Sequence, residues 1–409
     1  MQTTISEKYK QTAQGQEAES ILRACVHCGF CTATCPTYQL LGDELDGPRG
    51  RIYQIKQVLE GGEVTNTVRQ HLDRCLTCRS CETTCPSGVQ YGRLVDIGRE
   101  IVEQQLERPL KDKVMRAALR HILPYPQRTK VLMGAGYLVK NFTPAKLTKK
   151  LPPQQGTRKH RWEVKPQTRK VLAFDGCVQS IATPSTNAAT ARVLEKLGVE
   201  LVKIEKAGCC GAVDQHLAAP EAAKDFMRRN IDAWWPQIEA GAEAIAVTAS
   251  GCGVMIKDYG HLLKNDPAYA EKAARVSTLA KDISEILRDL AIPKASAQQI
   301  PEGMKKVAFH SPCTLQHGQQ LNGVVESILS KAGFTLTPVA DAHLCCGSAG
   351  TYSILQPELS QQLLSNKLDA LQTSEPDIIA TANIGCQMHL GSEANKKVIH
   401  WIELLDTVL

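Results

Sequence analysis

The spacing of the cysteines constrains this chain more than any other feature of its sequence. The 16 cysteines fall into three groups, with eight from Cys25 to Cys85, none over residues 86–176, and then four and four. Sixteen in 409 residues is too few for a small scaffold stapled by disulfides, and a hydrophobic content of 43% is ample for two or three packed domains. The grouping therefore points to metal binding in a reducing compartment.

The first eight cysteines form two copies of one motif, CxxCxxCxxxCP, 50 residues apart. Three cysteines on one tight loop can bind three irons of a cubane, and in two-cluster ferredoxins the fourth cysteine of each run serves the other cluster. Two zinc sites are the alternative, but a third cysteine so close to the second suits a single tetrahedral ion poorly. We therefore predict two [4Fe-4S] clusters, the first held by Cys25, Cys28, Cys31 and Cys85 and the second by Cys75, Cys78, Cys81 and Cys35.

Several arginines lie close to these cysteines in the sequence. Their positive charge could raise the reduction potential of an anionic cubane, or they could be solvated surface charges. The five are Arg23, Arg49, Arg51, Arg74 and Arg79.

The C-terminal two thirds of the chain is an internal duplication. Apolar segments typical of buried strands lead into each cysteine, at 170–175, 199–204 and 244–249 in the first copy and at 306–310, 335–340 and 377–382 in the second. The cysteines of the copies are offset by 136 residues at the first three positions and by 134 at the last, and the tails from Val276 and Val398 also resemble each other. Alternating strands and helices predict two α/β units with parallel sheets.

Each copy carries a lone cysteine, then Cys-Cys-Gly, then Gly-Cys. In parallel sheets the carboxyl ends of the strands meet at one edge, so these cysteines should gather in one crevice and share a redox or metal role. The first copy has Phe174, Ala207 and Met255 where the second has His310, His343 and His389, and His317 is added. The candidate metal ligands are Cys177, Cys209, Cys210 and Cys252 in the first copy and Cys313, Cys345, Cys346, Cys386 and His389 in the second.

Nearly all the basicity of the chain lies between the two cysteine-bearing regions. Residues 104–170 hold 17 Lys and Arg against three acidic residues, whereas the whole chain has a net charge of only +6, too small to indicate nucleic-acid binding. Residues 111–123 read as a basic amphipathic helix, 129–142 as an apolar helix fringed by lysines, and 151–170 as a linker. Residues 111–150 could attach to an anionic membrane surface, or connect the domains and dock on a partner.

These patterns together predict an α+β multidomain protein. An α-helical ferredoxin-type domain (1–103) is followed by a basic helical connector (104–169) and two α/β cysteine-rich domains with parallel sheets (170–295 and 296–409). No apolar run is long enough to span a bilayer and the N-terminus lacks a secretory signal, so we expect a cytoplasmic protein. Motifs for binding flavin, nicotinamide or nucleotide are missing from the sequence, which indicates that a partner holds the hydride-accepting cofactor.

The chain resembles a group of proteins that join a two-[4Fe-4S] ferredoxin module to tandem CCG (cysteine-rich) domains. The resemblance is strongest to glycolate oxidase iron-sulfur subunits, and other members of the group are subunits of anaerobic glycerol-3-phosphate dehydrogenase and of heterodisulfide reductase. It covers nearly the whole chain apart from the basic middle. The segments that carry it include ILRACVHCGFCTATCPTYQLLGDELDGPRGRI, LTCRSCETTCPSG, AGCCGAVD, TASGCG, LCCGSAGTY and TANIGCQMH.

The resemblance implies an electron-transfer subunit of a multisubunit glycolate dehydrogenase. Separate FAD-containing subunits would oxidise glycolate, with D-lactate as a further candidate, to the oxo acid. This chain would have no catalytic residue of its own and would pass electrons towards quinone, as a peripheral protein of the inner membrane. A lactate or glycerol-3-phosphate dehydrogenase subunit is the alternative substrate assignment.

One departure from the fullest CCG motif bears on the second half of the chain. That motif ends in CxxC, whereas the two copies end in Cys252-Gly-Val-Met255 and Cys386-Gln-Met-His389. This argues against a five-cysteine noncubane cluster and leaves a cubane, a zinc ion or a reversible disulfide for each copy. It also argues against the remaining alternative function, a thiol-disulfide reductase acting through these cysteines.

Overall fold

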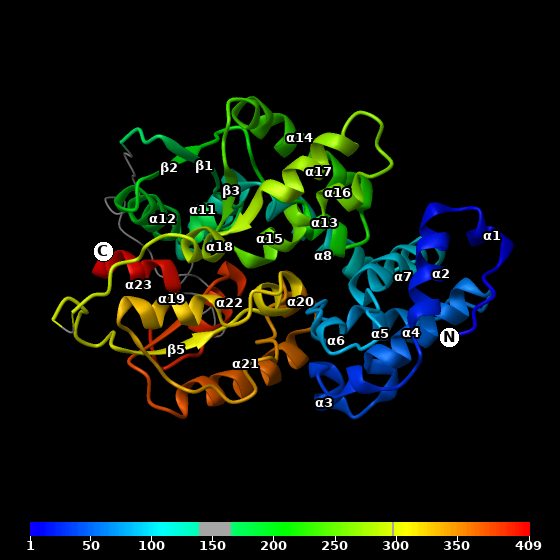
Figure 1. Cartoon of the computed structure of the whole chain (residues 1–409). Helices are drawn as coiled ribbons and strands as arrows, with labels where there is room; N and C mark the ends of the chain where they lie inside the picture. The colour runs from blue at the N-terminus through cyan, green and yellow to red at the C-terminus, as the bar shows by residue number, and fades with distance from the viewer. Residues whose placement is uncertain (139–164, 297) are drawn as a thin grey trace.

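The computed structural model describes residues 1–138, 165–296 and 298–409. It is an α+β multidomain protein, with a helical N-terminal module beside two α/β units (Figure 1). Residues 151–164 of the predicted linker lie outside the described residues, and its last two residues, Arg169 and Lys170, begin strand β1. The predicted division of the chain at residues 103, 169 and 295 stays a prediction.

The N-terminal module consists of short helices around one apolar core. Leu22, Leu59 and Leu94 are fully buried at its centre, where α2, α4 and α7 pack together. The elements are α1 (Glu7–Lys10), α2 (Ala13–Ala24), η1 (Phe30–Thr32), α3 (Pro36–Leu41), η2 (Glu44–Asp46), α4 (Pro48–Leu59), α5 (Asn66–Asp73), α6 (Ser80–Thr83) and α7 (Tyr91–Gln105).

The basic connector forms two helices over its described part, α8 (Leu110–Ile122) and α9 (Pro126–Leu138). The amphipathic helix predicted at 111–123 is confirmed, as is the described part of the one predicted at 129–142. Arg116 of α8 pairs with Asp73 at 3.0 Å and Arg120 pairs with Asp214 at 2.7 Å, so α8 bridges the N-terminal module and the first α/β unit.

Each α/β unit contains a parallel four-stranded sheet, in the order β2-β1-β3-β4 and β6-β5-β7-β8. The six predicted strands are confirmed, with β3 ending two residues and β6 four residues earlier than predicted. The strands are β1 (Arg169–Phe174), β2 (Val199–Lys203), β3 (Ala244–Val247) and β4 (Ala280–Asp282) in the first copy and β5 (Lys306–His310), β6 (Thr335–Leu336), β7 (Ile378–Thr381) and β8 (Val398–His400) in the second.

Helices cover the sheets as βαβ crossovers require. In the first copy they are α11 (Gln179–Ala182), α12 (Pro184–Lys196), α13 (Ala212–His216), α14 (Pro220–Glu239), α15 (Ser250–Lys257), α16 (Tyr259–Leu262), α17 (Ala270–Leu279) and α18 (Ile283–Arg288). In the second copy they are the π-helical turn η5 (Thr314–Gly318), α19 (Val324–Ala332), α20 (Tyr352–Leu355), α21 (Pro357–Gln372), α22 (Ile384–Gly391) and α23 (Trp401–Val408).

The similar tails of the two copies contain strands β4 and β8, which the sequence did not reveal. Three residues are too few to show a strand periodicity, and each strand is only the edge of its sheet. Asp282 and His400 occupy equivalent positions at the ends of these two strands. Each side chain caps the following helix by accepting a hydrogen bond from the backbone N–H two residues later.

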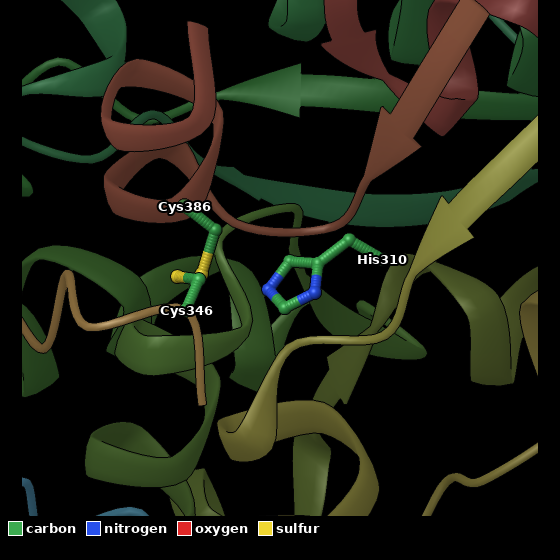
Figure 2. A group of neighbouring side chains, drawn as sticks. All are labelled: His310, Cys346 and Cys386. Carbon is green, nitrogen blue, oxygen red and sulfur yellow. The ribbon is translucent and has the colours of Figure 1, made fainter. Parts of the chain in front are cut away.

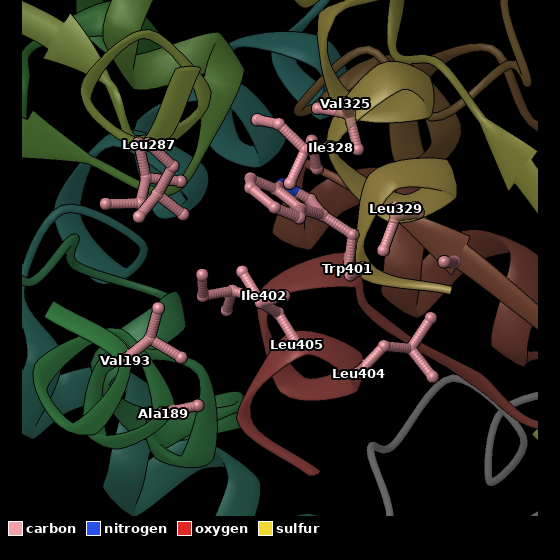
Figure 3. Close-up of a cluster of buried hydrophobic side chains, with 14 of the residues drawn as sticks. Ala189, Val193, Leu287, Val325, Ile328, Leu329, Trp401, Ile402, Leu404 and Leu405 are labelled. Atoms are coloured by element: carbon pink, nitrogen blue, oxygen red, sulfur yellow. The ribbon is translucent and has the colours of Figure 1, made fainter. Parts of the chain in front are cut away.

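The two copies share one hydrophobic core, in which their helices pack as pseudo-symmetric pairs. Helix α12 of the first copy contacts α23 of the second, and α19 of the second contacts α18 of the first. Trp401 and Leu405 of α23 are fully buried against residues of these helices (Figure 3). The duplication is therefore a fused pseudo-dimer, in which each copy buries the apolar face of the other.

Salt bridges attach the N-terminal module to the first copy. Glu17 accepts from both His261, at 2.8 Å, and Lys264, at 2.7 Å, and Arg79 pairs with Asp258 at 2.7 Å. Helices α3 and α6 of the module contact α21 and η5 of the second copy. The module thus lies against both α/β units.

Truncating Leu405 tests the shared core. Leu405→Ala should lower the free energy of unfolding by about 2–5 kcal/mol, because it leaves a cavity between the two copies. The measurement is the shift of the chemical denaturation midpoint of the α/β units. Leu110→Ala, at a position 76% exposed, is the matched control and should change stability by less than about 0.5 kcal/mol; equal shifts would contradict a shared core.

Candidate functional site

The two N-terminal cysteine runs form loops of matching shape. His27 and Gly29 in the first loop and Thr77 and Arg79 in the second all have left-handed backbones, with φ of 59°, 88°, 53° and 59°. These are the same positions of the two runs, 50 residues apart. Left-handed residues between the cysteines curl the chain, so that three thiols of each run turn toward one centre.

The fourth cysteine of each run lies with the other run. Cys31 interacts electrostatically with Cys25, Cys28 and Cys85. Cys81 interacts in the same way with Cys75, Cys78 and Cys35. Each set also lines a pocket of its own. This is the grouping that the sequence predicts for two clusters.

The donor sets fit iron-sulfur clusters. Burial and the neighbouring thiol of Cys25 raise the pKa of Cys31 to about 11, and burial likewise raises the pKa of Cys81. Four thiolates in one pocket repel one another, so they need a cationic centre to be held together. Hydrogen bonds from the Thr77 N–H, at 3.4 Å, and the Tyr91 hydroxyl, at 3.7 Å, reach Cys75 Sγ.

Arg51 is a buried cation of this module, and it pairs with the buried Asp46 at 3.3 Å. Its side chain is only 1% exposed and donates to His71 O at 2.7 Å and to Thr37 Oγ1 at 3.1 Å. Burial by itself lowers the pKa of the guanidinium, but anionic neighbours including Cys75 and Cys35 more than offset this and raise it. The arginines could act on a cluster or be solvated surface charges. The buried position of Arg51 fits the first role, in which its positive charge acts on the second cluster.

The other four arginines form ion pairs, and two of them, Arg49 and Arg79, also line the first and the second pocket. Arg23 pairs with Glu19, Arg49 with Glu44, Arg74 with Asp46 and Arg79 with Asp258. The sequence reading missed Arg99, which is buried and donates to Leu72 O, Cys75 O and Thr77 Oγ1. Arg99 therefore fixes the loop of the second run. It lies on α7 far from both motifs, so no local signal marked it.

The two pockets differ in exposure. Cys28 is exposed, and beside it Val26 and Phe30 are 66% and 62% exposed, so the first pocket lies at the surface. The second pocket faces inward, where Leu76 and Cys78 pack with Cys313, Cys345 and Tyr352 of the second copy. The cysteines of the second copy are therefore next to the second pocket.

In each α/β copy the cysteines gather at the carboxyl edge of the sheet, as predicted. Cys177 Sγ lies 3.6 Å from Cys209 Sγ, and Cys313 Sγ lies 3.9 Å from Cys345 Sγ. The second cysteine of each Cys-Cys pair interacts with the last cysteine, Cys252 or Cys386. Each crevice thus brings all four predicted cysteines together.

The backbone conformation after each Cys-Cys pair requires a glycine. Gly211 and Gly347 have φ of 90° and 88°, and their N–H groups donate to Cys209 Sγ and Cys345 Sγ at 3.5 Å and 3.4 Å. A Cβ at Gly347 would lie 2.6 Å from Ser360 O. Only glycine permits this close turn beneath the sulfur.

The histidines of the second copy have different surroundings. Burial holds the pKa of His310 well below its usual range, and its ring lies beside Cys346 and Cys386 (Figure 2). His389, the predicted candidate ligand, lies with Nε2 3.1 Å from the hydroxyl of Ser360. In this group the imidazole beside the cysteines is that of His310.

His317 and His343 lie on the side of the second copy that faces the N-terminal module. The two ring nitrogens of His317 lie 2.9 Å from Thr83 Oγ1 and from the backbone oxygen of His343. His317 therefore joins the module to the second copy.

Comparison with known families agrees with this architecture. Residues 21–89 match the family described as a 4Fe-4S dicluster domain, and residues 171–257 and 307–391 each match the family described as a cysteine-rich domain. The fold and the site thus define a dicluster iron-sulfur protein with tandem cysteine-rich domains.

Whole-chain relatives narrow this class. The chain is 56% identical over 409 residues to the glycolate oxidase iron-sulfur subunit of Escherichia coli, covering 100% of this chain and 99% of that one. It is 32% identical over 423 residues to a probable glycolate oxidase iron-sulfur subunit of Bacillus subtilis, covering 95% and 94%. The chain belongs to the family of glycolate oxidase iron-sulfur subunits.

Two further proteins show a more distant similarity to this chain, one in sequence and one in fold. Lactate utilization protein A of Bacillus licheniformis is 29% identical over 248 residues, covering 58% of this chain and 99% of that one. A solved structure of a hypothetical protein from Helicobacter pylori has the same fold over 98% of this chain and 73% of its own, with a TM-score of 0.57 and 10% identity. Within the described residues, every helix is too short or too polar to cross a bilayer.

The exchange of fourth cysteines can be tested by spectroscopy. Cys35→Ser should alter the same cluster signal as Cys78→Ser, and Cys85→Ser the same signal as Cys28→Ser, because each pair shares a pocket. The measurement is low-temperature EPR of the reduced protein, with iron and sulfide analysis. A Cys35→Ser spectrum that matches Cys28→Ser would show instead that each run holds its own cluster.

Proposed function

We propose that this chain is the electron-transfer subunit of a flavin-dependent glycolate dehydrogenase complex. An FAD-containing partner would oxidise glycolate to glyoxylate, and this chain would carry the electrons onward. The observation that carries the proposal is the continuity of two cysteine sites, one at the surface and one inside, next to the second copy. Two [4Fe-4S] clusters, when bound, supply one-electron carriers at these sites.

The surface pocket is the side at which we place the flavin-bearing partner. Cys28 is exposed, and the large apolar side chains of Val26 and Phe30 stand out on either side of it. Exposed apolar side chains next to a redox site favour a protein contact that excludes water. A partner docked here would bring its flavin near the first set of cysteines.

At the other end, the second pocket adjoins the second copy. Burial and the electrostatic neighbour Cys313 raise the pKa of Cys78, and Cys345 likewise interacts with Cys78. In the first copy, Cys252 packs against a small apolar cluster that Met133 of α9 also contacts. We therefore propose that electrons leave the second pocket on the side of the second copy, with quinone as the final acceptor.

The substrate assignment rests on the relatives. Both full-length relatives carry the glycolate oxidase name, whereas the lactate utilization protein aligns with only 58% of this chain. Glycolate is thus the proposed substrate of the complex, with D-lactate as a second 2-hydroxy acid for the same partner.

Cys78→Ser tests the electron path. It should leave reduction of the partner's flavin by glycolate unchanged, while reduction of an external acceptor falls to near background, because it removes a ligand between the first pocket and the second copy. Stopped-flow flavin absorbance and steady-state dye or quinone reduction measure the two steps. Wild-type turnover in this variant would sink the proposal, and iron analysis checks that the first cluster remains.

We also propose that the connector attaches the complex to the cytoplasmic face of the inner membrane. Three side chains of α9 are strongly exposed, Val131 at 73%, Leu132 at 55% and Leu138 at 84%, and in α8 Leu110 is 76% exposed. Most of the Lys and Arg residues in the described part of the basic segment also lie in these two helices. Apolar side chains among Lys and Arg are typical of helices that lie in an anionic lipid surface. Residues 139–150 of the predicted segment lie outside the described residues.

Liposome flotation tests this attachment. The double variant Val131→Asp, Leu132→Asp should lose most of its binding to vesicles containing phosphatidylglycerol, because it places carboxylates in the lipid surface. Ile354→Asp, which also alters an exposed apolar residue, is the matched control and should float like the wild type. Equal flotation of the double variant and the control would argue that α9 docks on a protein instead.

A further inference from the structure

The second α/β copy contains a compact group of metal-ligand side chains. One donor atom from each of His310, Cys346 and Cys386 lies within 4.8 Å of the others, and all three residues are buried. They come from the end of β5, the loop after β6 and the start of α22, and Figure 2 shows the imidazole beside the two cysteine side chains. The carboxyl edge of the sheet thus brings together three ligands from distant parts of the sequence.

The surroundings leave these donors available to a cation. His310 Nε2 is buried and has no hydrogen-bond partner among the described residues. An unpaired buried imidazole nitrogen is costly, and a metal ion would satisfy it. The Asn383 amide lies 3.6 Å from Cys386 Sγ and the Ser348 N–H donates to Cys346, and both contacts favour the thiolate forms that bind metal.

The first copy lacks this group. Phe174 occupies the position of His310 at the end of the corresponding strand. Its ring packs edge-on against that of Trp234, with 6.0 Å between the two ring centroids. Cys210 and Cys252 are still neighbours there, but within the part of the chain that the structure describes no imidazole completes a group with them. The same fold, at the same edge of the sheet, thus provides three ligands in one copy and two in the other.

We propose that His310, Cys346 and Cys386 bind one Zn²⁺ ion. Two thiolates and a neutral imidazole are a ligand set that zinc accepts, and three protein ligands leave a fourth position for water or an exogenous ligand. Binding releases the two thiol protons, so the ion and its two thiolates carry no net charge inside the protein. The proposal concerns only the second copy and stands apart from the electron-transfer role of the N-terminal cysteines.

Metal analysis of the full chain tests the site. Anaerobically purified wild type should contain about one zinc per chain in addition to its iron, measured by inductively coupled plasma mass spectrometry. His310→Phe, which installs the residue of the first copy, should lose this zinc while iron, sulfide and the EPR signals stay unchanged. His343→Ala removes a half-buried histidine of the same copy that lies outside the group, and it should keep the zinc.

Cobalt gives an independent readout. Protein produced in zinc-depleted, cobalt-supplemented medium should show the cobalt-thiolate charge-transfer absorption above the iron-sulfur background, and Cys386→Ser should abolish it. Wild type without zinc or cobalt, or zinc retained in His310→Phe, would overturn the proposal. So would a loss of iron in place of zinc in that variant, or a Cys346–Cys386 disulfide found by peptide mapping of the wild type.

Discussion

Mutual repulsion between thiolates is the constraint on which this structure depends. Burial first, and the neighbouring thiols in addition, raise the pKa values of Cys31 and Cys81, so four thiols in one pocket resist ionisation and need a cationic centre to hold them together as thiolates. Each pocket draws three thiols from one tight loop and the fourth from the other run. Neither loop can therefore complete its site alone, and cluster binding couples the two halves of the module. The buried Arg51 adds positive charge where the thiol density is greatest.

A second constraint is the direction of the strands. Parallel sheets place all their carboxyl ends at one edge, so a cysteine after each of three strands is enough to make a crevice. The duplication repeats that crevice, and the paired helices α12 with α23 and α18 with α19 lock the copies into a pseudo-symmetric unit. The surroundings of the two copies differ, because Cys78 of the N-terminal module packs with cysteines of the second copy, while Cys252 of the first copy packs against an apolar cluster that Met133 of the connector also contacts.

The two copies therefore differ in the surroundings of their cysteines and in the roles these can have. The second copy lies next to the second pocket of the N-terminal module, whereas Cys252 of the first copy packs against a small apolar cluster. The histidines follow the same division, since His317 contacts Thr83 of the module and His310 lies with two cysteines where the first copy has Phe174. Duplication followed by divergence of one copy thus accounts for identical cysteine spacing with unequal neighbours.

Sequence by itself determined the repeated cysteine runs, the duplication and its parallel strands, and the grouping of cysteines into two sets of four and two crevices. Those features follow from short-range spacing and from the fixed geometry of βαβ units. Only the tertiary structure showed that Arg51 and Arg99 are buried around the second pocket, that Cys78 lies beside Cys313, and that His310 rather than His389 joins two cysteines. These contacts join segments far apart in the chain, and they depend on how packed helices orient side chains, which no local pattern encodes.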